Sequence, residues 1–340
     1  MHRDTLSEVR AALQEVPSLL LTTHVRPDGD ALGAEVGLAR FLRALGKEVR
    51  IFNCDDPPPN LRWLGELFPI ERYTASPEQQ AYLERVACVV VLDLNALHRI
   101  EELSEPVRKT RARKVVIDHH LDPEPFFEVA YIRPEAAATC ELVFDLIESW
   151  DLDRLDTGMA TALYVGLMTD TGSFRYDSVT PRVHEIAAEL LRRGGFSPAE
   201  VHRRIFDQWR PQSLRLLGMV LQTVQVHCQG RLSLLEVRRM MLMETGADYA
   251  ELEGFVNFGL SLADVEATVL MVEYPDYIRL SFRSKTTYPV NQWARLFGGG
   301  GHRNAAGGRS ELDWESTRRR LIETFPLFDP QPEAGMPPLR

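Results

Sequence analysis

Cysteine and long apolar runs are both scarce in this sequence. It contains four cysteines in 340 residues, and no two of them form a C-x-x-C pair. The spacing therefore predicts neither a disulfide framework nor a zinc-thiolate site. No apolar run approaches the ~18 residues of a membrane span, and the opening stretch MHRDTLSEVRAALQEV is charged rather than signal-like. We therefore expect a cytoplasmic protein.

Positive charge is also in short supply. The sequence has 39 Lys and Arg against 49 Asp and Glu, which gives a net charge of -10. Proteins that grip long nucleic acid need a broad basic face, so this class is disfavoured, whereas a small anionic substrate bound locally is compatible with the charge. The one long glycine run is not followed by G-K-[ST], which argues against an NTPase P-loop.

The first half of the sequence alternates between apolar runs and helical patterns. Such alternation predicts an α/β fold with a mainly parallel sheet that is covered on both faces. The expected strands cover residues 18–24, 47–53, 86–93 and 114–120, with a helix over 31–46. Helical patterns then dominate from 138 to 226, with starts at TPRVHE and SPAEVH.

A chain of this length is long enough for two domains. Strand-rich segments return after residue 229 and predict a smaller α/β domain, and the end of the chain is rich in proline. We predict a catalytic domain, a helical connector, a substrate-binding domain and a tail, over residues 1–195, 196–228, 229–325 and 326–340.

Acidic residues and histidines follow several of the expected strands. The stretch TTHVRPDGDALGA crowds His24, Asp28 and Asp30 together, and such close carboxylates resist joint ionisation unless a cation lies between them. Asp93 ends the third strand, and Asp170 follows an apolar helical run. The tripeptide DHH, Asp118 to His120, ends the fourth strand. Open parallel sheets bind ligands at the carboxyl ends of their strands, so we expect these side chains to meet.

The residues that could bind metal supply four carboxylates and two imidazoles: His24, Asp28, Asp30, Asp93, His119 and Asp170. This set is enough for two divalent cations that share one carboxylate, and four negative charges balance two such cations. Oxygen ligands favour manganese or magnesium over zinc, and the imidazoles favour manganese, with Mg2+ and Co2+ as alternatives. The competing interpretation is that PDGD is a simple turn and DHH a solvated strand end. Four independent motifs at corresponding places disfavour it.

Four motifs, HVRPDGDALGA, VLDLNALHRI, VIDHHLD and MTDTGSFRY, resemble those of the DHH phosphoesterases. The stretch FGGGGHRNAAGG resembles the signature of their associated C-terminal domain, so the resemblance covers residues from about 15 to 325. Among the branches, the chain is most similar to the stand-alone bacterial nanoRNases that also act as pAp phosphatases. One departure is DLNALHRI, where threonine and alanine often follow the aspartate.

The resemblance implies roles for the individual residues. His24 and Asp28 would bind one metal, Asp30, His119 and Asp170 the other, and Asp93 would bridge them. His120 would face the scissile phosphate, so the implied catalytic residues are Asp93, Asp118 and His120.

The C-terminal motif indicates where substrate binds. Small residues let backbone amides approach a phosphate, and arginine matches its oxygens, although a lone Arg283 or Lys285 is more often a solvated surface charge. The resemblance implies substrate binding by Arg283, Ser284, Gly299, Gly300, His302 and Arg303, with residues 298–308 as a glycine loop. Four aromatic residues could stack on bases but are not assigned to the site: Phe174, Tyr176, Tyr288 and Trp293. Trp293 lies in an expected helix and is predicted to pack in the core.

The implied activity is manganese-dependent hydrolysis of short RNA to nucleoside 5'-monophosphates, with pAp dephosphorylation as a second activity. The resemblance also implies substrates of roughly two to five nucleotides, and the acidic chain offers no track for longer RNA. Expected partners are short single-stranded RNA, dinucleotides and pAp, with a homodimer as the expected assembly and no membrane or long duplex. One alternative is a hydrolase of linear or cyclic dinucleotides such as pApA and cyclic di-AMP, or of pyrophosphate or polyphosphate. Another is a non-catalytic nucleotide sensor, which would not need the full ligand set.

Overall fold

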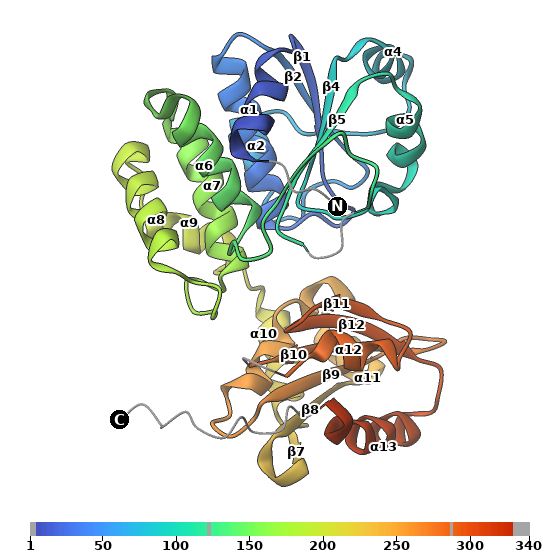
Figure 1. Cartoon of the computed structure of the whole chain (residues 1–340). Helices are drawn as coiled ribbons and strands as arrows, with labels where there is room; N and C mark the ends of the chain where they lie inside the picture. The colour runs from blue at the N-terminus through green and yellow to red at the C-terminus, as the bar shows by residue number, and fades with distance from the viewer. Residues whose placement is uncertain (1–4, 121–123, 286–287, 329–340) are drawn as a thin grey trace. The chain divides into compact units, whose positions relative to one another are not determined.

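The computed structural model describes residues 5–120, 124–285 and 288–328 (Figure 1). The chain forms two compact units, the first ending at Gln208 and the second beginning at Trp209. This division falls inside the expected connector, 196–228. No helix in the described ranges combines the length and the apolar character needed to cross a membrane.

The first unit is built around a six-stranded parallel sheet in the order β3-β2-β1-β4-β5-β6. Its strands are β1 (Ser18–Thr22), β2 (Glu48–Asn53), β3 (Glu71–Arg72), β4 (Cys88–Leu92), β5 (Arg113–Asp118) and β6 (Val129–Ile132). The expected parallel α/β sheet is therefore confirmed. The short edge strands β3 and β6 were not expected, since neither carries a run of apolar residues long enough to stand out.

Helices cover both faces of this sheet, as the alternation of buried side chains along β1 requires. Leu19 and Leu21 pack into one apolar core and Leu20 into the other. The helices of the unit are α1 (Leu6–Gln14), α2 (Gly29–Ala44), α3 (Leu64–Leu67), α4 (Pro77–Arg85), α5 (Ser104–Lys109), α6 (Thr139–Asp151), α7 (Thr157–Asp170), α8 (Pro181–Gly194) and α9 (Pro198–Ile205), with 3-10 turns η1 (Leu97–Leu103) and η2 (Leu152–Arg154). The side chains of Thr180 and Ser197 cap α8 and α9, which confirms the expected helix starts.

Helices α2 and α7 pack along a stripe of glycines, Gly29, Gly33 and Gly37. A Cβ atom at Gly33 would lie 2.4 Å from the carbonyl oxygen of Ala162 on α7. No side chain fits between the helices there, so their backbones determine their spacing. The stripe runs from the N-terminus of α2, where Gly29 faces Thr169 near the C-terminus of α7.

The second unit has a mixed six-stranded sheet in the order β11-β12-β10-β9-β8-β7. Its strands are β7 (Gln225–His227), β8 (Leu232–Val237), β9 (Ala267–Glu273), β10 (Ile278–Ser284), β11 (Gly300–His302) and β12 (Ala305–Ser310). The helices are α10 (Pro211–Leu221), α11 (Arg239–Thr245), α12 (Val290–Arg295) and α13 (Trp314–Thr324), with 3-10 turns η3 (Cys228–Gly230), η4 (Tyr249–Leu252), η5 (Phe255–Ser261) and η6 (Phe325–Phe328). β8 and β9 are parallel, and the other pairings are antiparallel.

The glycine-rich segment 298–308 is a β-hairpin, so the expected loop was wrong. Gly300 pairs with Gly307 and His302 with Ala305, and β12 continues the sheet next to β10. A Cβ atom at Gly299 would lie 1.8 Å from the Gly307 carbonyl oxygen, which explains why glycine is needed for this close pairing. Pairing with β10 gives this segment a regular strand conformation, which its local sequence did not indicate.

Two minor expectations concern side chains away from the sheet ends. Trp293 is fully buried on α12, which confirms its expected place in the core, and Tyr288 is buried beside it with its ring 5.8 Å away. All four cysteines are free thiols: Cys54, Cys88, Cys140 and Cys228.

Candidate metal centre

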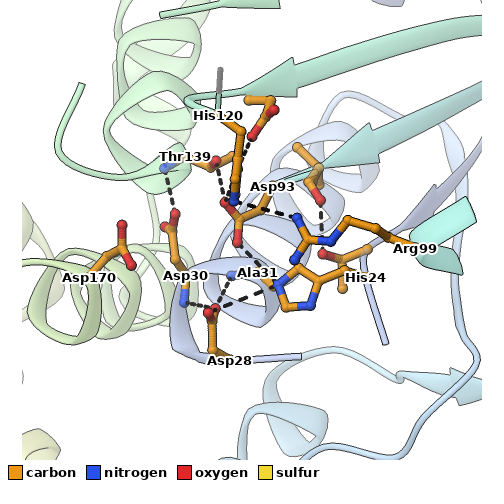
Figure 2. Close-up of polar contacts among 12 residues, drawn as sticks. His24, Asp28, Asp30, Ala31, Asp93, Arg99, His120, Thr139 and Asp170 are labelled. Carbon is orange, nitrogen blue, oxygen red and sulfur yellow. Dashed lines mark hydrogen bonds and ion pairs between the residues drawn. The ribbon is translucent and has the colours of Figure 1, made fainter. Parts of the chain in front are cut away.

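The six expected ligands meet at the carboxyl edge of the parallel sheet, where β1 and β4 lie side by side. This is the point at which the strand order reverses direction, since the chain runs from β1 to β3 on one side and from β4 to β6 on the other. The ligands come from the ends of three strands, from the start of α2 and from the last residue of α7. Figure 2 shows the aspartates and His24 converging from these elements.

The local sequence explains why the first loop presents its acids inward. Asp28 is the N-cap of α2, and its Oδ1 accepts hydrogen bonds from the backbone amides of Asp30 and Ala31 at 3.0 and 3.1 Å. Capping leaves the other oxygen of Asp28 pointing toward His24, whose Nε2 lies 4.0 Å away. The turn that the PDGD sequence favours therefore also aims a carboxylate at the sheet edge.

Two ligand sets are formed, each with its ligand atoms within 4.8 Å of one another: His24, Asp28 and Asp93 in one, and Asp30, His119 and Asp170 in the other. The distances from His119 Nε2 to Asp170 Oδ2 and Asp30 Oδ2 are 3.4 and 3.9 Å. Asp93 links the sets, because its Oδ2 lies 3.5 Å from His24 Nε2 and its Oδ1 lies 3.4 Å from His119 Nε2. One carboxylate oxygen is thus available to each set, as a bridging ligand requires.

Backbone carbonyls fix the tautomers of two histidines. His24 Nδ1 donates to the carbonyl oxygen of Val25 at 2.9 Å, and His119 Nδ1 donates to that of Ala136 at 3.1 Å. Both rings therefore turn their Nε2 atoms toward the carboxylates. A neutral imidazole with a carbonyl on the far nitrogen is the usual arrangement of a metal-binding histidine.

The crowding of buried carboxylates at this centre shifts their pKa values. Burial and the nearby Asp93 carboxylate raise the pKa of Asp30 to about 7, and burial with the neighbouring Asp30 raises the pKa of Asp170 well above its usual value. Burial opposes ionisation of Asp93 as well, but hydrogen bonds from His119 and His24 hold its pKa well below the usual range. Such mutual strain among buried carboxylates is relieved when cations lie between them. The donor set therefore fits two divalent cations.

Asp118 and His120 form a separate pair beside the ligand sets. Asp118 is fully buried, and its Oδ1 accepts a hydrogen bond of 2.7 Å from His120 Nδ1. The ring of His120 is nearly perpendicular to that of His119, with an interplanar angle of 84°. His120 Nδ1 also lies 3.7 Å from Asp93 Oδ1, so a set of Asp93, His119 and His120 is a second way to hold one ion.

Sequence reasoning missed the support that α6 gives to Asp30. The backbone amides of Thr139 and Cys140, at the N-terminus of α6, donate to the two carboxylate oxygens of Asp30 at 2.6 and 2.8 Å. Thr139 Oγ1 also donates to Asp93 Oδ1 at 3.0 Å. Helix N-termini stabilise anions, so α6 holds two ligands in place. Nothing in the stretch EAAATC indicated this contact in advance.

Arg99, inside the VLDLNALHRI motif, was also not singled out. Its guanidinium Nη1 lies 3.5 Å from His120 Nε2, and Figure 2 shows it between His120 and His24. An arginine six residues after Asp93 was the available signal, and the turn η1 brings it back to the sheet edge.

The expected substrate-binding residues of the second unit gather at one end of its sheet. Arg283 on β10 pairs in register with Ala305, which in turn pairs with His302 on β11. The side chain of His302 lies outside the described part of the structure. Arg303 is exposed in the hairpin turn. The remaining three are Ser284, whose side chain is buried, and the glycines Gly299 and Gly300, which have only backbone atoms to offer.

These three positions differ in the space around them. Ser284 is buried, and its hydroxyl donates to the Tyr288 carbonyl oxygen at 2.6 Å. Gly299 is closed off by Gly307, whereas a Cβ atom at Gly300 would meet nothing within 4 Å. Gly300 is therefore the glycine at which a ligand could approach the backbone.

Comparison with known proteins agrees with this geometry. The chain belongs to the DHH family: the model of the DHH family N-terminal domain matches residues 18–167, and that of the DHHA1 domain matches residues 235–325. The resemblance found in the sequence motifs is thus confirmed.

Its relatives within the family match almost from end to end. The chain is 34% identical to the bifunctional oligoribonuclease and PAP phosphatase NrnA of Thermus thermophilus, covering 90% of this chain and 88% of that protein. It is 29% identical to the Bacillus subtilis protein of the same name, covering 90% and 93%. Among solved structures, an exopolyphosphatase-related protein from Bacteroides fragilis superposes with a TM-score of 0.89 at 31% identity, covering 95% and 97%.

Proposed function

We propose that this protein hydrolyses short oligoribonucleotides to nucleoside 5'-monophosphates and also removes phosphate from pAp, using two divalent cations, with manganese preferred. The observation that carries the proposal is the pair of ligand sets joined through Asp93. Support comes from similarity over nine-tenths of the chain to relatives named as oligoribonuclease and PAP phosphatase. The preference for manganese rests on the mixture of carboxylate and imidazole donors.

Each proposed ligand has a defined place in this scheme. His24 and Asp28 hold one cation, and Asp93 is shared with the other, which is held by Asp30, His119 and Asp170. Bound divalent cations of this kind lower the pKa of water and polarise phosphoryl oxygens. The chain's own contribution is to fix the donors on strand ends and helix termini, with the imidazole tautomers already set by Val25 and Ala136.

His120 is the proposed group on the scissile phosphate. Because Asp118 accepts from its Nδ1, the ring is held with Nε2 on the opposite side, free of Asp118. Asp118 is buried and belongs to none of the ligand clusters of the described residues, so its proposed role is to orient His120. A carboxylate that orients a histidine in this way also stabilises it when it carries a proton.

Residues of the second unit are proposed to bind the end of the substrate away from the scissile phosphate. Arg283, His302 and Arg303 bind phosphate or base there, and the open backbone at Gly300 admits a phosphate. Ser284 and Gly299 shape this end of the sheet in the proposal and do not donate to the substrate, because their backbone amides already donate to the carbonyl oxygens of Asn304 and Ala294. The hydroxyl of Ser284 is also used inside the unit. A homodimer and a cytoplasmic location are part of the same proposal, and the four free thiols are typical of a reducing compartment.

The test is hydrolysis by chelator-treated protein to which single metal ions are returned. Labelled RNAs of increasing length, pAp, pApA, cyclic di-AMP and pyrophosphate are assayed side by side. We expect no activity without metal, best recovery with Mn2+, and high kcat/KM on the shortest RNAs and on pAp. Full activity in the metal-free protein, or a clear preference for cyclic di-AMP or pyrophosphate, would refute the proposal.

Length dependence gives a second test. An acidic chain offers no basic track beyond the site, so kcat/KM should fall steeply for RNA of about twenty nucleotides. Equal kcat/KM on a trimer and on such an RNA would instead indicate a processive nuclease.

A further inference from the structure

Arg99 lies at the metal centre and has no acidic partner among the residues that the structure describes. Its Nη1 is 3.5 Å from His120 Nε2, and the side chain is half-buried. Within the described ranges, no carboxylate oxygen comes within 4.0 Å of its guanidinium. Two other half-buried arginines of the first unit do have such partners: Arg108 lies 2.6 Å from Glu124, and Arg182 lies 2.6 Å from Asp145. The structure thus places an unneutralised guanidinium beside the group proposed to meet phosphate.

The backbone of Arg99 is tied to the loop that carries His24. The Arg99 carbonyl oxygen accepts from the Val25 amide at 2.8 Å, and the Arg99 amide donates to the Ala96 carbonyl oxygen at 3.1 Å. Leu97 and Ile100 on either side are fully buried. The backbone of Arg99 is therefore fixed before any substrate arrives, and its guanidinium lies beside His120. Donors that are positioned in advance stabilise transition-state charge at little reorganisation cost.

The charge balance of the metal centre indicates a role for the Arg99 guanidinium. Four carboxylates and two divalent cations sum to zero, so a phosphoester entering the centre brings negative charge that the ligand sets do not offset. A guanidinium offers a planar fork of donors that matches two phosphate oxygens. The guanidinium contacts Nε2 of His120, the ring edge that faces away from Asp118. Arg99 therefore lies where His120 is proposed to meet the scissile phosphate.

We propose that Arg99 is a catalytic residue that donates hydrogen bonds to the non-bridging oxygens of the scissile phosphate, alongside His120. This inference rests on the proposed function, since it takes a phosphoester as the substrate. Arg99 belongs to the first unit and acts on the reacting phosphate. Arg283 and its neighbours in the second unit are instead proposed to hold the distal end.

The variants Arg99→Gln, Arg99→Lys and Arg111→Gln test the assignment. Arg111 is an exposed arginine just before β5 and is the matched control. For Arg99→Gln we expect kcat/KM on pApA to fall about 100-fold, as on removing one oxyanion donor, while bound manganese stays at the wild-type level. Lysine keeps the charge but lacks the fork, so Arg99→Lys should recover part of the loss. Arg111→Gln should match the wild type.

A binding measurement separates this inference from the proposed function. Inorganic phosphate is titrated into the manganese-loaded wild-type and Arg99→Gln proteins by calorimetry, and we expect weaker binding by the variant. If the wild type hydrolyses no phosphoester but binds phosphate through Arg99, the proposed function and the catalytic role of Arg99 both fail, and only its contact with phosphate stands. Unchanged kcat/KM with unchanged phosphate affinity would overturn the assignment. Loss of manganese from Arg99→Gln would also overturn it, because Arg99 would then support the metal ligands instead.

Discussion

Glu35 tests whether a buried hydrogen-bond network holds the strand ends that carry the metal ligands. It is fully buried on α2, where its Oε2 accepts a hydrogen bond of 2.8 Å from Asn53 Nδ2. Asn53 Oδ1 accepts from the Thr23 amide at 3.2 Å, and Thr23 Oγ1 donates to the Leu92 carbonyl oxygen at 2.8 Å. This chain of hydrogen bonds ends at the residues that precede His24 and Asp93.

Burial raises the pKa of Glu35 to about 8 from its ordinary value of 4.5, against the opposing effect of the Asn53 hydrogen bond. Between these values the folded chain binds a proton that the unfolded chain does not. The free energy of unfolding therefore decreases as pH rises, by about 1.4 kcal/mol per pH unit. From pH 6 to pH 8, where the folded group is half-ionised, Glu35 alone should cost about 2 kcal/mol.

The perturbation is Glu35→Gln, which keeps the size of the side chain and an acceptor for Asn53 but does not titrate. We expect the variant to gain about 2 kcal/mol over the wild type between pH 6 and pH 8. The assay is urea unfolding at both pH values on chelator-treated protein, since bound metal would change the nearby charges. Glu84→Gln, at an exposed position on α4, is the control and should follow the wild type. A difference between Glu35→Gln and wild type that is the same at both pH values would refute the reasoning, because Glu35 would then be ionised throughout.

Three further substitutions separate metal binding, chemistry and substrate capture. Asp93→Ala should abolish turnover and release manganese, because both ligand sets share this carboxylate; retained activity would mean that the bridge is misassigned. His120→Ala should lower turnover with manganese retained, measured by elemental analysis, whereas loss of metal would make His120 a ligand. Arg283→Ala should raise KM on short RNA with little change in kcat, as expected for lost ground-state binding. A fall in kcat alone would place Arg283 at the reacting phosphate instead.

Much of the first unit was predictable because its signals are local. Buried parallel strands are visible in the sequence as apolar runs. The side chains of Thr180 and Ser197 form the N-cap hydrogen bonds of α8 and α9, so these residues mark helix starts. The hairpin at Gly300 was not predictable on the same grounds. Glycine disfavours strands locally, and the pairing of β12 with β10 decides the conformation of this segment.

The candidate ligands were predictable for a topological reason, whereas the residues around them were not. Strand ends of a parallel sheet share one edge, so Asp93 and His119 come together whatever the intervening loops do. The amides of Thr139 and Cys140 and the guanidinium of Arg99 reach the centre only through the paths of α6 and η1. Those paths depend on packing between distant segments, which motif spacing does not encode.

The glycine stripe between α2 and α7 makes the interval between Asp30 and Asp170, two ligands of the same set, independent of side-chain volume. Asp30 stands at the start of one helix and Asp170 at the end of the other, and backbone meets backbone at Gly33. Evolutionary drift elsewhere in this core can exchange large and small side chains without changing that interval. At the stripe itself drift is blocked, since even one added methyl group would push the helices, and with them the aspartates, apart.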